Sequence, residues 1–167
     1  SEGSWIPTLN TVRLLLAQTS NPLERLTILL LLKTGLGVQE IVNLEVNDVY
    51  LGPSSSNITS TISPKSQPYL YVEQNEKGPG SGHSKRLCDT RVPIDRELET
   101  GIKRYLKVRP DSPHTQLLLS MSRWGEPFSS DSINHAVEKN ARKIGLHEKE
   151  GEMGRNLSPE RLMQCFK

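Results

Sequence analysis

Hydrophobic residues recur at helical spacing in the first quarter of the chain and predict three helices. The first follows Thr8, a residue type that often caps helices, and ends near residue 18. The second covers residues 22–34 and is apolar nearly all round, which is typical of a buried central helix. After two glycines a short helix is expected over residues 38–44. The start of the chain is therefore predicted to be helical, with one helix at the centre of the core.

The middle of the chain changes to the pattern of extended structure. Residues 46–51, 69–73 and 90–94 are rich in β-forming residues and predict three short strands or extended segments. Residues 52–67 are rich in Ser, Pro, Gly and Asn and predict a flexible linker between the first two. Residues 75–88 are Gly-rich and basic, and predict the tip of a hairpin formed by the last two. We therefore expect a small antiparallel hairpin or a three-stranded sheet.

Three further helices are predicted after the sheet. The first covers residues 96–107 and is expected to bury Leu98, Ile102, Tyr105 and Leu106. The second covers residues 131–144 and ends at Gly145, as helices with a C-terminal glycine do. The third begins with Pro159 at its first position. The order of helices, minor sheet and helices predicts a mostly helical α+β fold, in one domain over residues 1–167.

Composition excludes several classes of protein without indicating a function. The 167 residues are 34% hydrophobic and 24% charged, which excludes a collagen-like or disordered chain. Without a signal peptide or an apolar run of membrane-spanning length, we expect no membrane association and an intracellular place, in the cytoplasm or nucleoid. The two cysteines and four histidines match no zinc or disulfide pattern, so we expect no metal and no cofactor. Because the chain begins with Ser, we expect an excerpt of a longer protein.

Positive charge is concentrated in one part of the chain. The formal net charge is only +2, but residues 77–109 hold nine basic and four acidic side chains, a net charge of +5. Four of these cations lie on or beside the predicted hairpin: Lys77, Lys85, Arg86 and Arg91. Two interpretations remain open for them. They form either a solvated edge that discourages aggregation or a basic finger that follows a phosphate backbone.

Several segments match, in order, the motifs of one protein family. The strongest match is residues 33–49, in which the family positions are occupied by Gly35, Leu36, Glu40, Leu44 and Asp48. Lys77, the strand that begins at Arg91 and the sequence Leu-Ser-Pro-Glu-Arg-Leu-Met-Gln-Cys-Phe over residues 157–166 follow in turn. This order resembles the catalytic domain of tyrosine recombinases, the phage integrase and Xer family. The resemblance implies the fold of that catalytic core, double-stranded DNA as the partner, and DNA recombination or integration as the process.

The chain departs from this family at the positions that carry its chemistry. In the family a tyrosine attacks the phosphodiester, two arginines hold its oxygens, a lysine protonates the leaving oxygen and a histidine assists. The resemblance places Gly37 and Met163 at the arginine positions, Glu160 at the histidine position and Lys77 at the lysine position. Glycine and methionine donate no hydrogen bond to phosphate from a side chain, and a glutamate repels it. Strand cleavage is therefore expected to be lost, with no active catalytic residue.

The resemblance also implies a DNA-binding surface. It consists of the hairpin cations Lys77, Lys85, Arg86 and Arg91, with secondary phosphate contacts from the helix over residues 131–144 by Lys139, Arg142 and Lys143. Relative to the family core the chain is expected to be truncated at its C-terminus, before the tyrosine. Two alternatives stay open. One is a fragment of an active integrase with its tyrosine beyond residue 167. The other is a protein–protein interaction module, self-associating or binding a partner through the C-terminal end.

Overall fold

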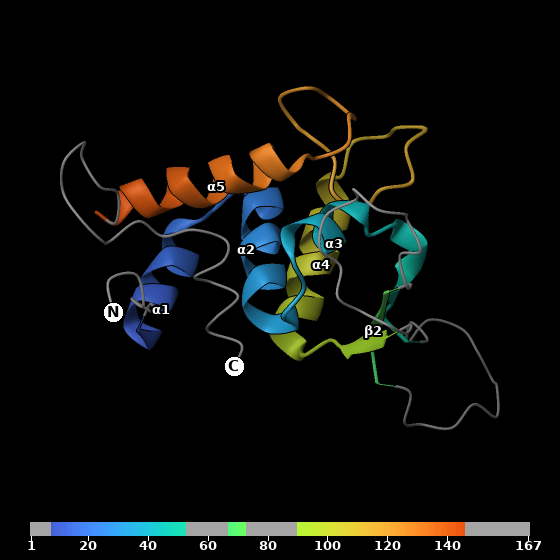
Figure 1. Ribbon diagram of the computed structural model, residues 1–167, viewed down its shortest axis with the longest axis horizontal. Coiled ribbons are helices and arrows are strands. Elements are labelled where there is room, and N and C mark those ends of the chain that lie inside the picture. The colour runs from blue at the N-terminus through green and yellow to red at the C-terminus, as the bar shows by residue number, and fades with distance from the viewer. Residues whose placement is uncertain (1–7, 53–66, 73–89, 146–167) are drawn as a thin grey trace, which may run out of the picture.

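The computed structural model describes residues 8–52, 67–72 and 90–145 (Figure 1). Within these ranges, helices come first, then a small sheet, then helices again. In chain order the elements are α1 (Leu9–Gln18), α2 (Pro22–Thr34), α3 (Val38–Asn43), the 3-10 helix η1 (Val46–Asp48), β1 (Val49–Tyr50), β2 (Tyr69–Val72), β3 (Thr90–Pro93), α4 (Arg96–Val108) and α5 (Ser130–Lys143). The predicted α+β class is confirmed. None of the helices in the described ranges is long and apolar enough to cross a lipid bilayer.

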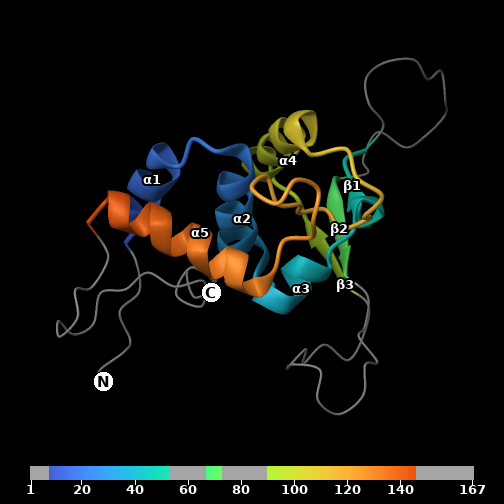
Figure 2. The same ribbon diagram turned by 90° about the horizontal axis from the view of Figure 1, so that it is seen from above.

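Helix α2 is the central element, as its sequence predicts. The Asn21 side chain caps it by accepting a hydrogen bond from the Leu23 N–H at 2.9 Å. Pro22 stands at its first position, and Gly35 ends it in the left-handed conformation, with φ of 68°. The helix packs against α4 on one side and α5 on another, and Figure 2 shows it between them. Because α2 has neighbours on most of its surface, an all-round apolar sequence suits it.

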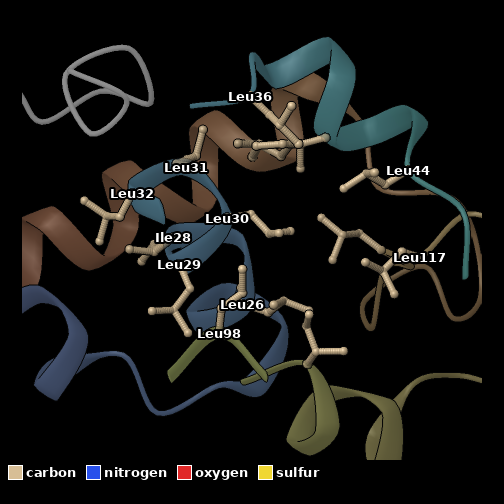
Figure 3. Packing of buried hydrophobic residues seen from close by; sticks show 14 of the residues in the cluster. Leu26, Ile28, Leu29, Leu30, Leu31, Leu32, Leu36, Leu44, Leu98 and Leu117 are labelled. Atoms are coloured by element: carbon tan, nitrogen blue, oxygen red, sulfur yellow. The ribbon is translucent and has the colours of Figure 1, made fainter. Parts of the chain in front are cut away.

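The hydrophobic core forms around α2. Figure 3 shows the leucines of this helix beside Leu36, Leu44, Leu98 and Leu117, which come from four other parts of the chain. Gly101 lets α4 approach α2 closely, because a Cβ atom at this position would lie 2.7 Å from the Leu29 Cδ1 atom. A single core thus holds the helices on both sides of α2 and the inner face of the sheet.

The sheet is antiparallel, with strand order β1-β2-β3. Leu70 pairs with Val49 on one side and with Val92 on the other. Leu70, Val72 and Val92 are buried in the core, whereas Tyr69 and Arg91, one residue along each strand, belong to the outer face. The predicted three-stranded sheet is therefore confirmed, with strands slightly shorter than expected.

The first predicted strand, over residues 46–51, is wrong in its first half. Residues 46–48 form η1, and only Val49 and Tyr50 pair with β2. The reason is local, because the Asp48 carboxylate accepts a hydrogen bond from the Glu45 N–H at 2.9 Å. The Asp48 N–H in turn donates to the Glu45 carbonyl at 3.0 Å. Such side-chain bonds to nearby backbone compete with strand pairing.

The two later helices agree with the prediction except at one side chain. Asp95 caps α4 and Ser129 caps α5, each by accepting a hydrogen bond from an N–H group three residues later. Three of the four expected core residues of α4 are fully buried, but Leu106 is 37% exposed. Leu106 follows the buried Tyr105 directly and is therefore turned about 100° around the helix, away from the core. Gly145, with φ of 78°, follows α5 as predicted.

Candidate functional site

Gly37 lies in the short turn between α2 and α3. Its backbone is ordinary extended chain, with φ of −72° and ψ of 163°, so the conformation does not require glycine. Among the described residues, a Cβ atom here would meet the Glu40 Oε1 atom alone, at 3.6 Å, which is normal van der Waals contact. The Gly37 N–H donates a hydrogen bond to the same oxygen at 3.1 Å. The backbone and the described surroundings therefore admit a Cβ atom at the position that the resemblance assigns to an arginine.

The end of α2 that precedes this turn is held by an ion-pair cluster. The Lys33 Nζ atom lies 2.6 Å from the Asp95 carboxylate and 3.3 Å from that of Glu97, which links α2 to the start of α4. Partial burial alone would raise the pKa of the Asp95 carboxyl, but hydrogen bonds from Lys33 and the Leu98 N–H lower it overall. Partial burial alone would likewise lower the pKa of Lys33. The hydrogen bond to Asp95 and the charge of Glu97 outweigh this effect, so the pKa of Lys33 is raised. Lys33 and Asp95 are thus both charged at neutral pH.

Acidic side chains from the described residues line a depression beside the turn. A depression of about 90 Å³ between α3 and β2 is lined in part by Glu40, Glu45 and Asp48. The Glu45 carboxylate accepts a hydrogen bond from the Thr115 hydroxyl at 2.7 Å, and the other two carboxylates accept from backbone N–H groups. No group of three or more metal-ligating side chains occurs in the described part of the chain. These carboxylates therefore serve as structural caps of the turns.

Arg91 lies on the outer face of the sheet and is exposed. Its guanidinium carbon lies 4.9 Å from the centre of the Tyr69 ring, in a cation–π contact. The Tyr69 ring centre is in turn 4.9 Å from that of Tyr50. Of the four predicted hairpin cations, Arg91 is the one within the described residues.

The three predicted cations of α5 differ in their surroundings. The Lys139 Nζ atom lies 3.1 Å from the carboxylate of Glu24, whose side chain is only 10% exposed. Arg142 and Lys143 are exposed in the last turn, where positive charge also suits the helix dipole. This end of α5 lies near α1, whereas the sheet lies at the opposite end of the molecule (Figures 1 and 2). Arg91 and the α5 cations therefore do not form one cluster.

The remaining predicted site residues fall outside the described residues. They are Lys77, Lys85, Arg86, Glu160 and Met163. The same holds for the hairpin tip over residues 75–88, the helix expected from Pro159 and almost all of the linker over residues 52–67. The assignments made for these residues remain predictions.

Sequence reasoning missed a groove beside α5. It has a volume of about 670 Å³ and lies between the start of α2, the segment over residues 120–128 and the first half of α5. The segment is well ordered by hydrogen bonds, among them Ser120 N–H to the Glu126 carbonyl at 2.7 Å and Ser112 hydroxyl to the Gly125 carbonyl at 2.7 Å. The lining combines hydroxyl groups with charged side chains of both signs. Because these residues come from separate segments of the chain, no single sequence motif predicts the groove.

Comparison with known proteins identifies the family of this chain. The sequence pattern of the phage integrase family matches residues 8–162. The chain belongs to the phage integrase family. The resemblance seen in the motifs is thereby confirmed, as is the expected fold of the tyrosine recombinase catalytic core.

Individual members of the phage integrase family are more distant. Tyrosine recombinase XerA of Pyrococcus horikoshii is 25% identical over 155 residues, which cover 93% of this chain and 43% of that protein. The crystal structure of XerA recombinase matches with a TM-score of 0.70 at 19% identity, over 98% of this chain and 49% of that one. This chain therefore spans less than half the length of these relatives.

Two DNA complexes from the phage integrase family have the same fold. A lambda integrase dimer bound to a COC' core site matches with a TM-score of 0.62 at 16% identity, over 97% of this chain and 50% of that one. The Tn1549 transposon integrase in complex with transposon right end DNA matches with a TM-score of 0.70 at 15% identity, over 99% and 52%. At these identities the likeness establishes the fold alone.

Proposed function

We propose that this chain is a DNA-binding domain of the phage integrase family that has lost strand cleavage. The observation that carries the proposal is Gly37, which leaves the first arginine position without a side chain although its backbone conformation is open to any residue. Glu40 matches the family pattern and accepts a hydrogen bond from the Gly37 N–H. A phosphate held here would meet no guanidinium from residue 37, so a bidentate contact is missing.

Duplex DNA binding is supported by the family and by the distribution of charge. The two similar structures described above hold DNA, and the +5 stretch over residues 77–109 is the most basic part of this chain. Backbone phosphates attract such a stretch regardless of base sequence. Arg91 is exposed on the strand that follows the hairpin tip and extends this positive surface onto the sheet.

Loss of cleavage is supported by three positions at once. The family's two arginines and its histidine correspond to Gly37, Met163 and Glu160. Removing a single donor that stabilises transition-state charge typically slows an enzyme by about 100- to 1,000-fold. Two lost donors and one added anion leave Lys77 without the groups that would hold the phosphate beside it.

The hairpin cations provide the first test of this proposal. The Lys85→Ala/Arg86→Ala variant is expected to bind a random-sequence duplex about 10- to 30-fold more weakly at low salt, because two phosphate contacts are lost. The slope of log affinity against log salt should fall by about two units, equally for all sequences. Fluorescence anisotropy at several salt concentrations measures both quantities.

A matched control separates local contacts from net charge. Arg13→Ala/Arg123→Ala also removes two exposed cations, but from α1 and from the segment before α5, both outside residues 77–109. This variant should retain the slope of the native chain. Equal slopes for both double variants would contradict a role for the hairpin, and absence of binding at low salt by the native chain would contradict the proposed function.

Gly37→Arg provides the second test, through a gain of function. The added guanidinium should raise duplex affinity about tenfold and steepen the salt slope by about one unit, because it restores one phosphate contact. The control Leu106→Arg adds the same charge on α4, at a side chain that is 37% exposed. Identical slopes for the two variants would place residue 37 away from the DNA backbone. A covalent adduct trapped on a nicked duplex by the longest protein containing this chain would disprove the loss of cleavage.

A further inference from the structure

Three side chains form a continuous stack across the outer face of the sheet. Tyr50 of β1 pairs directly with Tyr69 of β2, and their ring centres are 4.9 Å apart with the ring planes inclined by 33°. Arg91 of β3 lies diagonally across from Tyr69, and its guanidinium carbon is 4.9 Å from that ring centre. The row Tyr50–Tyr69–Arg91, here called the stack, thus crosses all three strands.

The stack is presented to solvent. The buried side chains of the same strands, Leu70, Val72 and Val92, fill the opposite face of the sheet. Tyr50 is 38% exposed and stands on the edge strand, with only β2 paired to β1 in the sheet. Cross-strand contacts of this kind stabilise a sheet on their own. Such contacts do not require an aromatic residue on the edge strand, and Tyr50 remains more than one-third exposed there.

This combination of groups has a defined binding chemistry. Tyrosine rings on an open sheet face stack against nucleobases, and each such contact is insensitive to base identity because every base has a π face. An exposed guanidinium on the same face suits the phosphate that accompanies the base. A base inside a duplex is already stacked on both sides, so only an unpaired base has a face free for Tyr50.

We propose that the stack binds an unpaired DNA base on the exposed ring of Tyr50, with Arg91 holding a neighbouring backbone phosphate. Two features favour DNA as the occupant. Arg91 supplies complementary charge, and β2 and β3 are the strands that flank residues 73–89, where the sequence carries three further cations, Lys77, Lys85 and Arg86. The inference rests on the proposed DNA binding and adds a substrate class to it, namely DNA with a locally opened duplex.

The experiment compares two DNA molecules of the same length. One is a perfect duplex, and the other carries a short internal bubble of unpaired bases with 2-aminopurine in it. The native chain is expected to bind the bubble about tenfold more tightly and to quench the 2-aminopurine fluorescence, as stacking on one ring predicts. Tyr50→Leu should lose both the preference and the quenching, and bind the perfect duplex unchanged. Tyr50→Phe, which keeps the ring, should retain them.

The outcomes separate this inference from the proposed function. Equal affinity of the native chain for both molecules overturns the inference and leaves duplex binding intact. Preserved preference in Tyr50→Leu, with a thermal melt like that of the native chain, also overturns it, because the ring is then not the contact. Failure to bind either DNA overturns the proposed function, and the inference with it.

Discussion

The Leu30→Ala variant is expected to lose about 3–4 kcal/mol of unfolding free energy, the largest effect that we predict. Leu30 is fully buried on α2, inside the leucine cluster (Figure 3). Truncation removes buried methyl groups and leaves a cavity that close-packed neighbours on several elements cannot fill. Urea denaturation followed by far-UV circular dichroism measures the loss as a shift of the midpoint.

Leu14→Ala is the matched control for this variant. Leu14 lies on α1 and is 59% exposed, so the same truncation should change the unfolding free energy by less than about 0.5 kcal/mol. The comparison also concerns the site, because α2 leads directly into the turn that holds Gly37. If Leu30→Ala and Leu14→Ala cost the same, α2 is not the central helix of the core.

Tyr105→Phe is expected to cost about 2 kcal/mol, which is unusual for the loss of one oxygen atom. The buried Tyr105 hydroxyl donates to the Leu117 carbonyl at 2.8 Å and accepts from the Leu119 N–H at 2.9 Å. Burial raises the pKa of this hydroxyl, so it keeps its proton and its donor role. In the variant Arg109 still donates to Leu117, but the buried Leu119 N–H loses its partner.

Tyr50→Phe tests the same chemical change on an exposed ring. Tyr50 lies at the sheet edge and is 38% exposed, so the expected cost is below about 0.5 kcal/mol. Thermal and urea unfolding of the two variants, side by side, give the difference. A cost for Tyr105→Phe no larger than that for Tyr50→Phe would mean that the hydroxyl does not anchor residues 117–119.

Local signals in the sequence predicted the element boundaries well. Thr8, Asp95 and Ser129 each cap the helix that follows, and Gly35 ends α2, because these effects depend on hydrogen bonds within a few residues. The same kind of local bond explains the main error. Asp48 and Glu45 wind residues 46–48 into a turn, although the apolar pattern there is that of a strand.

The features of the candidate site also differ in how far the sequence alone could predict them. The sequence alone identified the family, because that depends on motif order and residue type. The substitutions at residues 37, 160 and 163 are predictions from the same motif order. It also located the positive charge over residues 77–109. It did not reveal that Lys139 is paired with Glu24, since those residues are 115 positions apart and meet only when α5 packs on α2.

Tertiary structure alone decided what surrounds each of these residues. Only the folded chain reveals that the backbone at Gly37 and its described surroundings admit a Cβ atom, and that Tyr50, Tyr69 and Arg91 form one row. The row depends on strand register, which joins residues that are far apart in the sequence. The sequence by itself determined which chemical groups the protein carries and where its helices begin and end. Packing between distant segments determined which of those groups are neutralised, which are exposed and which act together.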